Sequence, residues 1–445
     1  MRIPLLLFAA VLFSVPGRAQ ETWSLTRCIQ YAREHNIQIK QQVLQKRLAD
    51  LTLKQSRLSQ IPSLNGNVNY GFNFGRSVNP TTYEFDNTQF NSGNIGVNSS
   101  VTLFNFFQKR NTIAADKYAA QAADATVQKL FNDVSLNIAT AYLQMLQARE
   151  QVKVSEEQVS LTQHQLENTT KQVEAGSLPE SNRADLIAQL ARDSSDLITN
   201  QNSATMAVLQ MKALLNLDFE TEFEPEIPEN IDDIPLLNLL ATGPRQIYEG
   251  ALAVQPQLKA DSFQILSSEK RVDAAKSALY PSIALSGGIG SNYASATRTI
   301  TGEKVPFGKQ LDNNFNENIG IGLNIPIFNG WQARAGVRQA QIDLENQRLT
   351  KEQDQLQLKQ DIYQAYADAG AALEKYHAAQ KSLEASRTAF FYASKRYELG
   401  VVNSIDYLTS QNNLYKAQTD MLTSHYEYVF KMKVLEFYRD LNIHF

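Results

Sequence analysis

Long stretches of this chain carry the hydrophobic pattern of helices that pack side by side. Residues 111–175, 180–216 and 404–445 contain neither glycine nor proline, and residues 337–399 contain only Gly370. In the first stretch apolar side chains recur seven residues apart, as in the series Val127, Val134, Ala141 and Ala148. A helix of ~65 residues is about 100 Å long, which far exceeds an ordinary globular core. The pattern therefore predicts coiled-coil packing or a helical array.

Between these stretches lie short segments in which apolar and polar residues alternate. Residues 64–74, 94–103 and 318–327 alternate strictly, and residues 283–290 do so more weakly. A period of two predicts strands with one apolar and one polar face. Such alternation fits either a membrane barrel or a small soluble sandwich, and the polar positions, mostly asparagine, glycine, serine and threonine, suit the wet wall of a pore. The predicted strands cover about 62–75, 92–105, 281–293 and 316–328.

The same series of elements occurs twice, which indicates a tandem duplication. Pro62-Ser63 recurs as Pro281-Ser282, and Leu103-Phe104-Asn105 recurs as Ile327-Phe328-Asn329. Each copy reads as a helix, two strands, one very long helix, a break and another helix.

The duplication divides the chain into two repeats and a linker. We expect the first repeat at 20–217 and the second at 243–445. The acidic, proline-rich residues 218–242 between them are interpreted as a solvated linker or, alternatively, as an anionic binding patch. The long helices are expected at about 108–216 and about 331–440.

The N-terminus has the pattern of an export signal. Arg2 precedes a short apolar stretch, and Gly17 and Ala19 are small residues at the positions that a signal peptidase requires. We therefore expect a signal peptide at residues 1–19. The only cysteine, Cys28, has no partner for an internal disulfide and lacks the small, apolar run that precedes a lipidated cysteine. We expect it to be a buried structural thiol without a lipid anchor.

Charge and motif content remove several classes of function. The 42 basic and 46 acidic residues give a net charge of −4, which does not suggest a nucleic-acid partner. The five histidines form no close pair and no metal-ligand spacing, and no nucleotide-binding or hydrolase motif is present. We therefore predict a chain with no enzyme activity, no cofactor and no metal site.

Four strands per chain are too few to enclose a pore in a membrane. The smallest membrane barrels have about 8 strands, and lipid does not tolerate open sheet edges. In the barrel interpretation several chains must share one sheet, and a symmetric trimer supplies 12 strands.

Together these features resemble the TolC-like outer membrane efflux protein family, over essentially the whole chain from Trp23 onward. The resemblance implies a mainly α fold with a membrane β-barrel, in a homotrimer that shares a 12-stranded barrel in the outer membrane lipid. A long α-helical tunnel would cross the periplasm, and the linker at 218–242 would belong to an equatorial girdle. The motifs that carry the resemblance are Ser24-Leu25-Thr26 through Asn36, Arg245 to Leu258, Leu103-Phe104-Asn105 and Pro326-Ile327-Phe328-Asn329-Gly330.

The resemblance further implies a passive exit duct of a tripartite efflux or secretion system. Such a duct docks through its periplasmic helical tips with an adaptor protein and an inner-membrane transporter. The helix breaks at 174–179 and 398–403 would be those tips. The implied adaptor contacts are Gly176, Leu178, Gly400, Val401 and Val402.

Asp406 lies six residues after Gly400, where the resemblance places an acidic ring that narrows the closed tunnel. Three symmetric copies would favour cations at this periplasmic gate. The alternative is an acidic residue that stabilises the start of a helix through the helix dipole. Thr409 replaces the second carboxylate that the family often has, which weakens the implied ring.

A different class of function remains open at this point, namely an exported coiled-coil scaffold or adhesin with small soluble sheets. The strands interrupt the helices twice in matched places and carry a neutral polar face, which favours the channel. Drug or metal efflux and protein secretion are equally compatible with the chain, because the substrate is selected upstream.

Overall fold

The computed structural model describes residues 22–78, 83–87, 89–226 and 239–441. The predicted signal peptide at 1–19 and linker residues 227–238 lie outside this described part. The chain divides into two compact units. The sheet unit comprises Gln42–Lys129 and Gln255–Gln357, and the helical unit comprises Met1–Gln41, Leu130–Val254 and Leu358–Phe445.

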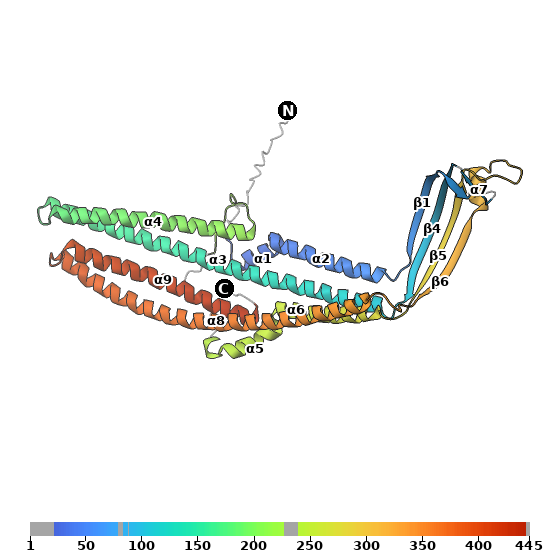
Figure 1. The fold of residues 1–445 in the computed structure, drawn as a ribbon. Helices are drawn as coiled ribbons and strands as arrows, with labels where there is room; N and C mark the ends of the chain where they lie inside the picture. Colours follow the sequence, from blue (N-terminus) through green and yellow to red (C-terminus); the bar gives the residue numbers. More distant parts are fainter. Residues whose placement is uncertain (1–21, 79–82, 88, 227–238, 442–445) are drawn as a thin grey trace, which may run out of the picture. The chain divides into compact units, whose positions relative to one another are not determined.

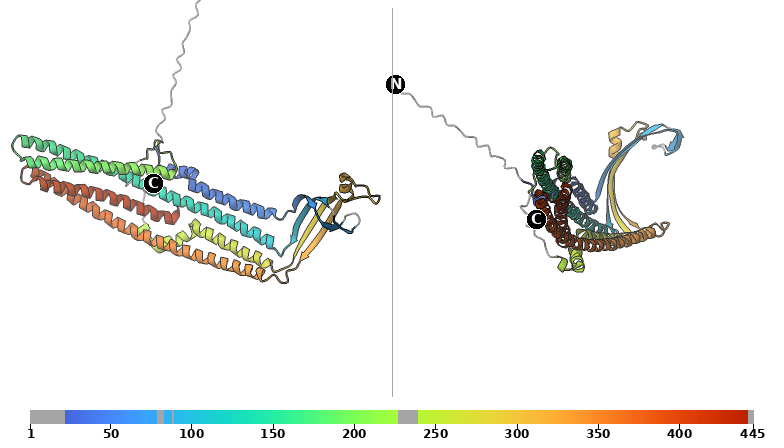
Figure 2. Two further views of the ribbon diagram at one scale, coloured as in Figure 1. Left: turned by 45° about the horizontal axis from the view of Figure 1, so that its top comes forward. Right: turned by 90° about the vertical axis from the view of Figure 1, so that its left-hand side faces the viewer.

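Four antiparallel strands form one sheet in the sheet unit, in the order β1-β4-β5-β6 (Figure 1). The two repeats meet between β4 and β5, where Val97 lies opposite Ile289. Figure 2 shows the strands side by side in a curved sheet. Among the described strands, β1 and β6 each pair on one side only, so the sheet has two open edges. The bounds are β1 (Ser63–Asn73), β4 (Phe90–Phe104), β5 (Ser282–Ala294) and β6 (Asn316–Asn324).

Two small elements in the sheet unit are absent from the pattern-based prediction. A hairpin of β2 (Arg76–Val78) and β3 (Phe85–Asn87) lies between β1 and β4 in sequence, and α7 (Phe307–Asn313) lies between β5 and β6. One side chain of α7, that of Gln310, connects this helix to the end of β5 and to the loop before α7. The buried Gln310 accepts a hydrogen bond from the Ala294 amide at 3.0 Å and donates one to the Val305 carbonyl at 2.8 Å. Elements this short are determined by such contacts and have no periodicity to detect.

The helices repeat the same order in both copies. A helix pair precedes each pair of sheet strands, and two long antiparallel helices joined by a turn follow it. The predicted mainly helical fold with four strands and a duplicated order is thereby confirmed. Every helix that the structure describes is too short or too polar to serve as a membrane-spanning segment. The bounds are α1 (Leu25–His35), α2 (Ile37–Leu58), α3 (Gln108–Glu174) and α4 (Glu180–Leu215), then α5 (Pro244–Val254), α6 (Pro256–Ser277), α8 (Gln332–Glu398) and α9 (Ser404–Asp440).

The first helix of each copy is broken into two, which the sequence pattern does not predict. In the first copy the break is at Asn36, whose buried side chain accepts a hydrogen bond from the Gln38 amide at 2.9 Å. The same side chain donates to the Leu214 carbonyl at 3.0 Å. It therefore caps the start of α2 and provides a hydrogen-bond partner for a main-chain carbonyl at the end of α4. In the second copy Pro256 begins the new helix.

The core of the helical unit consists of small and branched apolar residues. On α3, Val134 and Ala141 of the predicted seven-residue series are buried, whereas Val127 and Ala148 are half-buried. Ile138 and Met145 on the same helix are also buried. Alanine at such positions lets helix backbones approach closely, as it does where α5, α8 and α9 meet. That cluster contains Ile247, Ala251, Ile362, Ala365, Ala369, Met432 and Leu435.

Candidate functional site

The polar face of the sheet is built from paired asparagine side chains. Asn69 donates to Asn94 and Asn98 donates to Asn67, each at 2.9 Å. Glycine on the neighbouring strand leaves room for the amides on this face, because Gly288 pairs with Asn98 and a Cβ there would lie 2.6 Å from the Asn98 side-chain oxygen. The result is a thin, neutral, hydrogen-bonding wall.

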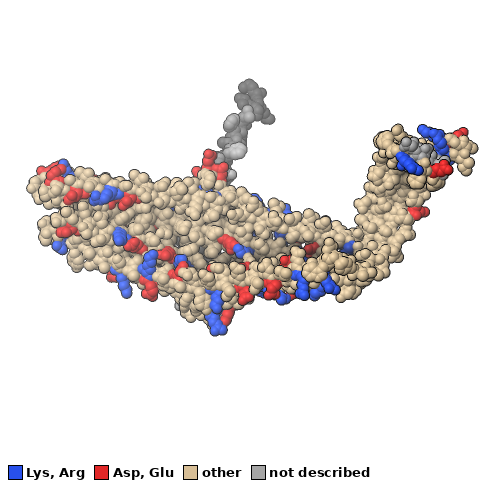
Figure 3. All heavy atoms as spheres, viewed as in Figure 1, with Lys and Arg blue, Asp and Glu red and all other residues tan. Residues whose placement is uncertain are grey.

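The opposite face of the same sheet is apolar and open. Leu64 is 74% exposed on β1, and Ile319 is 81% exposed on β6. On the face visible in Figure 3 few charged side chains lie over the strands, and several gather near α7. Soluble chains rarely expose so continuous an apolar surface, which therefore marks an interaction with lipid or protein.

The two turns at the ends of the long helix pairs have the same main-chain geometry. Gly176 has φ +74° and Gly400 has φ +69°. The Ser177 amide donates to the Gln172 carbonyl at 2.9 Å, and in the second copy the Val401 amide donates to the Arg396 carbonyl at 2.9 Å. Each turn is thus a Schellman motif with glycine at the left-handed position.

The apolar residues that follow each glycine differ in exposure. Val401 is 65% exposed, whereas Leu178 and Val402 are half-buried. Val402 packs on a buried cluster formed by Leu186, Tyr397, Tyr407 and Leu408. Burial raises the pKa of the Tyr407 phenol, in keeping with the position of this ring inside the apolar cluster on which Val402 packs.

Asp406 lies in the first turn of α9 with an exposed carboxylate. The cap of this helix is Asn403, whose side chain accepts a hydrogen bond from the Asp406 amide at 2.8 Å. Within the described residues no hydrogen bond or ion pair reaches the Asp406 carboxylate. Asp185, its equivalent in the first repeat, instead accepts a hydrogen bond from the buried Ser404 hydroxyl at 2.7 Å. The two copies therefore place one carboxylate in a helix contact and leave the other open.

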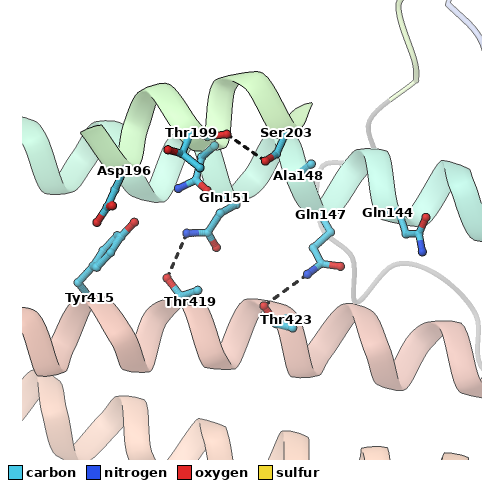
Figure 4. Close-up of a pocket in the computed structure, with 11 residues that line it drawn as sticks. Gln144, Gln147, Ala148, Gln151, Asp196, Thr199, Ser203, Tyr415, Thr419 and Thr423 are labelled. Atoms are coloured by element: carbon cyan, nitrogen blue, oxygen red, sulfur yellow. Dashed lines mark hydrogen bonds between the residues drawn. The ribbon is translucent and has the colours of Figure 1, made fainter. Parts of the chain in front are cut away.

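A polar cleft of about 470 Å³ lies between α3, α4 and α9 in the helical unit (Figure 4). Gln151 donates to the Thr419 hydroxyl at 3.1 Å and Gln147 to the Thr423 hydroxyl at 3.4 Å. These amide and hydroxyl groups can hold water between the helices, and the carboxylate of Asp196 also lines the cleft. In the described part of the chain no group of His, Cys, Asp or Glu side chains has the arrangement of a metal site.

Nearer the turns the same three helices meet through a buried carboxylate. Asp193 accepts hydrogen bonds from Thr162 at 2.6 Å, from Gln189 at 2.7 Å and from Gln158 at 3.3 Å. Gln411 of α9 completes the layer by donating to Thr162 at 2.7 Å. This buried polar layer could have been predicted from the seven-residue series of α3. The series continues beyond Ala148 as Ser155, Thr162 and Thr169, which are all buried.

The described start of the acidic linker is fixed to the helical unit. Arg149 forms an ion pair with Glu224 at 2.6 Å and lowers the pKa of that carboxyl. Trp23 stacks on Phe223, and the Trp23 amide donates to the Glu224 carbonyl at 2.8 Å. Cys28 is buried as predicted, and burial raises the pKa of its thiol to about 12.

The chain matches known proteins along most of its length. The family model described as "Outer membrane efflux protein" matches residues 28–217 and 247–431. The chain is 24% identical to the outer membrane efflux protein BepC of Brucella suis, over 95% of this chain and 87% of that protein. It is 21% identical to the outer membrane protein TolC of Escherichia coli K12, over 91% and 80%. The solved structure of the outer membrane protein VceC from Vibrio cholerae superposes with a TM-score of 0.76 at 15% identity, covering 93% of this chain and 96% of VceC.

The left-handed glycines give a prediction about the turns. A Cβ at Gly400 would meet no atom within 4 Å, so Gly400→Ala adds only backbone strain. We expect this variant to lose about 1–2 kcal/mol of stability, seen as a lower melting temperature of the purified protein. The control is Gly370→Ala, which also has open space but lies inside α8 and should gain about 0.5–1 kcal/mol. Equal melting temperatures for the two variants would contradict the assignment.

Proposed function

Because this chain belongs to the outer membrane efflux protein family, we propose that three copies of it close one conducting pore. Members of the family are outer-membrane channels of tripartite efflux or secretion systems, so the chain is a channel subunit and not an enzyme. This assignment excludes the alternative of an exported coiled-coil scaffold or adhesin. The observation that supports the trimer is the sheet, with its two open edges, its apolar face and its asparagine face.

In the proposed trimer, β6 of one copy pairs with β1 of the next. Three sheets of four strands then form one barrel of 12 strands. Closure pairs the main-chain groups along both edges, for which lipid offers no partners. The exposed residues Leu64 and Ile319 face lipid, and the asparagine pairs line the lumen. A neutral wall exerts no preference for charge, which suits a passive duct whose substrate is selected by its partners.

The long helices form a periplasmic tunnel in this proposal, and the two helix turns are its docking tips. A periplasmic adaptor protein contacts these tips and connects them to an inner-membrane transporter. Val401 supplies an exposed apolar contact, and the half-buried Leu178 and Val402 contribute the part of their side chains that remains accessible. Gly176 and Gly400 fix the direction of the chain at each tip. Residues 218–242 belong to an equatorial girdle between the repeats.

Asp406 is the proposed periplasmic gate residue. Its carboxylate is exposed near the second turn, and the cap of α9 is supplied by Asn403. Three symmetric carboxylates at one constriction attract cations and repel anions. The helix dipole of α9 also favours a negative charge at this position, so a modest stabilising role accompanies the gate role.

The gate proposal predicts a change in ion selectivity. In planar bilayers, Asp406→Asn channels should lose severalfold in cation over anion permeability, because the variant removes three charges from one constriction. The reversal potential in a salt gradient measures this ratio. The matched control is Asp420→Asn, which removes an exposed carboxylate further along α9 and should leave the ratio unchanged. Unchanged selectivity in the Asp406→Asn channel would refute the gate assignment.

The docking proposal predicts that a charge at Val401 weakens adaptor binding. A carboxylate there must be desolvated on docking, so Val401→Asp should reduce by several-fold the adaptor that co-purifies after crosslinking in the host envelope. Val401→Thr keeps the branched shape of the side chain and adds a neutral hydroxyl, which costs far less to desolvate than a carboxylate, so it should lose much less. If Val401→Asp retained full co-purification as an intact oligomer, the second turn would not be a docking contact.

A further inference from the structure

Two carboxyl groups, one of them buried, lie side by side between α6 and α8 within the sheet unit. Asp261 of α6 is buried, and Asp354 of α8 is half-buried. The side-chain amide of Gln257 donates to both, at 3.0 Å to Asp261 Oδ1 and at 2.7 Å to Asp354 Oδ2. One NH₂ group therefore holds two carboxyl groups side by side.

The second oxygen of Asp261 has no hydrogen-bond donor. Asp261 Oδ2 is fully buried, and no described group donates to it. A buried carboxylate oxygen without a donor carries a large desolvation cost. A proton on Asp261 removes that cost, since a protonated carboxyl donates a hydrogen bond and the Asp354 carboxylate, which the Gln257 amide holds beside it, can accept one.

The charges around Asp261 support the same protonation state. Burial and the nearby Asp354 raise the pKa of Asp261 to about 6, against the smaller opposing effects of Gln257 and Lys351. Lys351 is engaged elsewhere, because its ammonium donates to the Ser262 hydroxyl at 3.0 Å. Helix α3 also packs on α6, where Ser267 donates to the Ala115 carbonyl at 2.8 Å, but no charged residue of α3 is among the described groups that act on Asp261.

We propose that Asp261 and Asp354 share one proton and form a pH-sensitive clasp between α6 and α8. With the proton present, Asp261 donates to Asp354, and the buried oxygen of Asp261 no longer lacks a hydrogen-bond partner. When the proton leaves, two negative charges remain at the helix interface and only one amide separates them. The clasp is independent of the proposed trimer and of the gate.

The direction of the pH effect follows from the raised pKa of Asp261. A carboxyl whose pKa is higher in the folded state stabilises that state in its protonated form. The contribution is therefore complete below the ordinary aspartate pKa of about 4 and is lost as the pH rises through about 6. The difference between a pKa of about 4 and one of about 6 corresponds to roughly a 100-fold change in the folding equilibrium constant.

Melting of the full-length protein in detergent tests the clasp. We expect the wild-type melting temperature to fall as the pH rises from about 5 to about 7.5, and Asp261→Asn to remove much of this fall, because an asparagine amide donates to Asp354 at every pH. The control is Asp343→Asn, which neutralises an exposed carboxylate on the same helix as Asp354 and should keep the wild-type dependence. Identical pH profiles for wild type and Asp261→Asn would overturn the proposal.

Infrared difference spectroscopy gives a readout that does not depend on stability. Between about pH 5 and about pH 7.5 the wild type should lose the C=O band of one buried protonated carboxyl. This band should be absent in Asp261→Asn. In Asp354→Asn, where the second charge is gone, the band should disappear at a lower pH than in the wild type. A band that persists unchanged in both variants would assign the proton to another group and contradict the clasp.

Discussion

The unpaired main-chain groups along β1 and β6 are the constraint on which the rest of this molecule depends. The strands that carry them are eleven and nine residues long, so a long row of amide and carbonyl groups is left open at each edge. Each such group costs several kcal/mol if it enters lipid without a partner. The apolar face nevertheless suits lipid and not water. Both demands are met together only when other strands cover the edges, which is why the sheet of one chain is a third of a proposed barrel.

The two repeats share the same local structures but differ in the contacts that equivalent side chains make. Both helix turns are Schellman motifs with glycine in the left-handed region. Their following aspartates diverge: Asp185 accepts the Ser404 hydroxyl, whereas the carboxylate of Asp406 stays exposed. Local geometry is therefore inherited by both repeats, while the contact that each carboxylate makes depends on which helix lies beside it.

Patterns formed by residues close together in the sequence could be recognised from the sequence alone. The seven-residue spacing pointed to the packed side of α3 through Val134 and Ala141, alternation pointed to the four sheet strands, and glycine pointed to both turns. Contacts between residues far apart in sequence were not readable. The Asn36 cap depends on Leu214, α7 depends on Gln310 meeting Ala294, and Gln257 of α6 meets Asp354 of α8. The positions of the gate and of the adaptor contacts stay predictions, because both depend on chains other than this one.

The mass of the detergent-extracted protein, with the bound detergent subtracted, tests the shared barrel most directly. Light scattering on the outer-membrane extract should give about three times the 49.9 kDa chain, slightly less if a signal peptide has been removed. A mass of one or two chains would leave strand edges open in lipid and would contradict the trimeric channel.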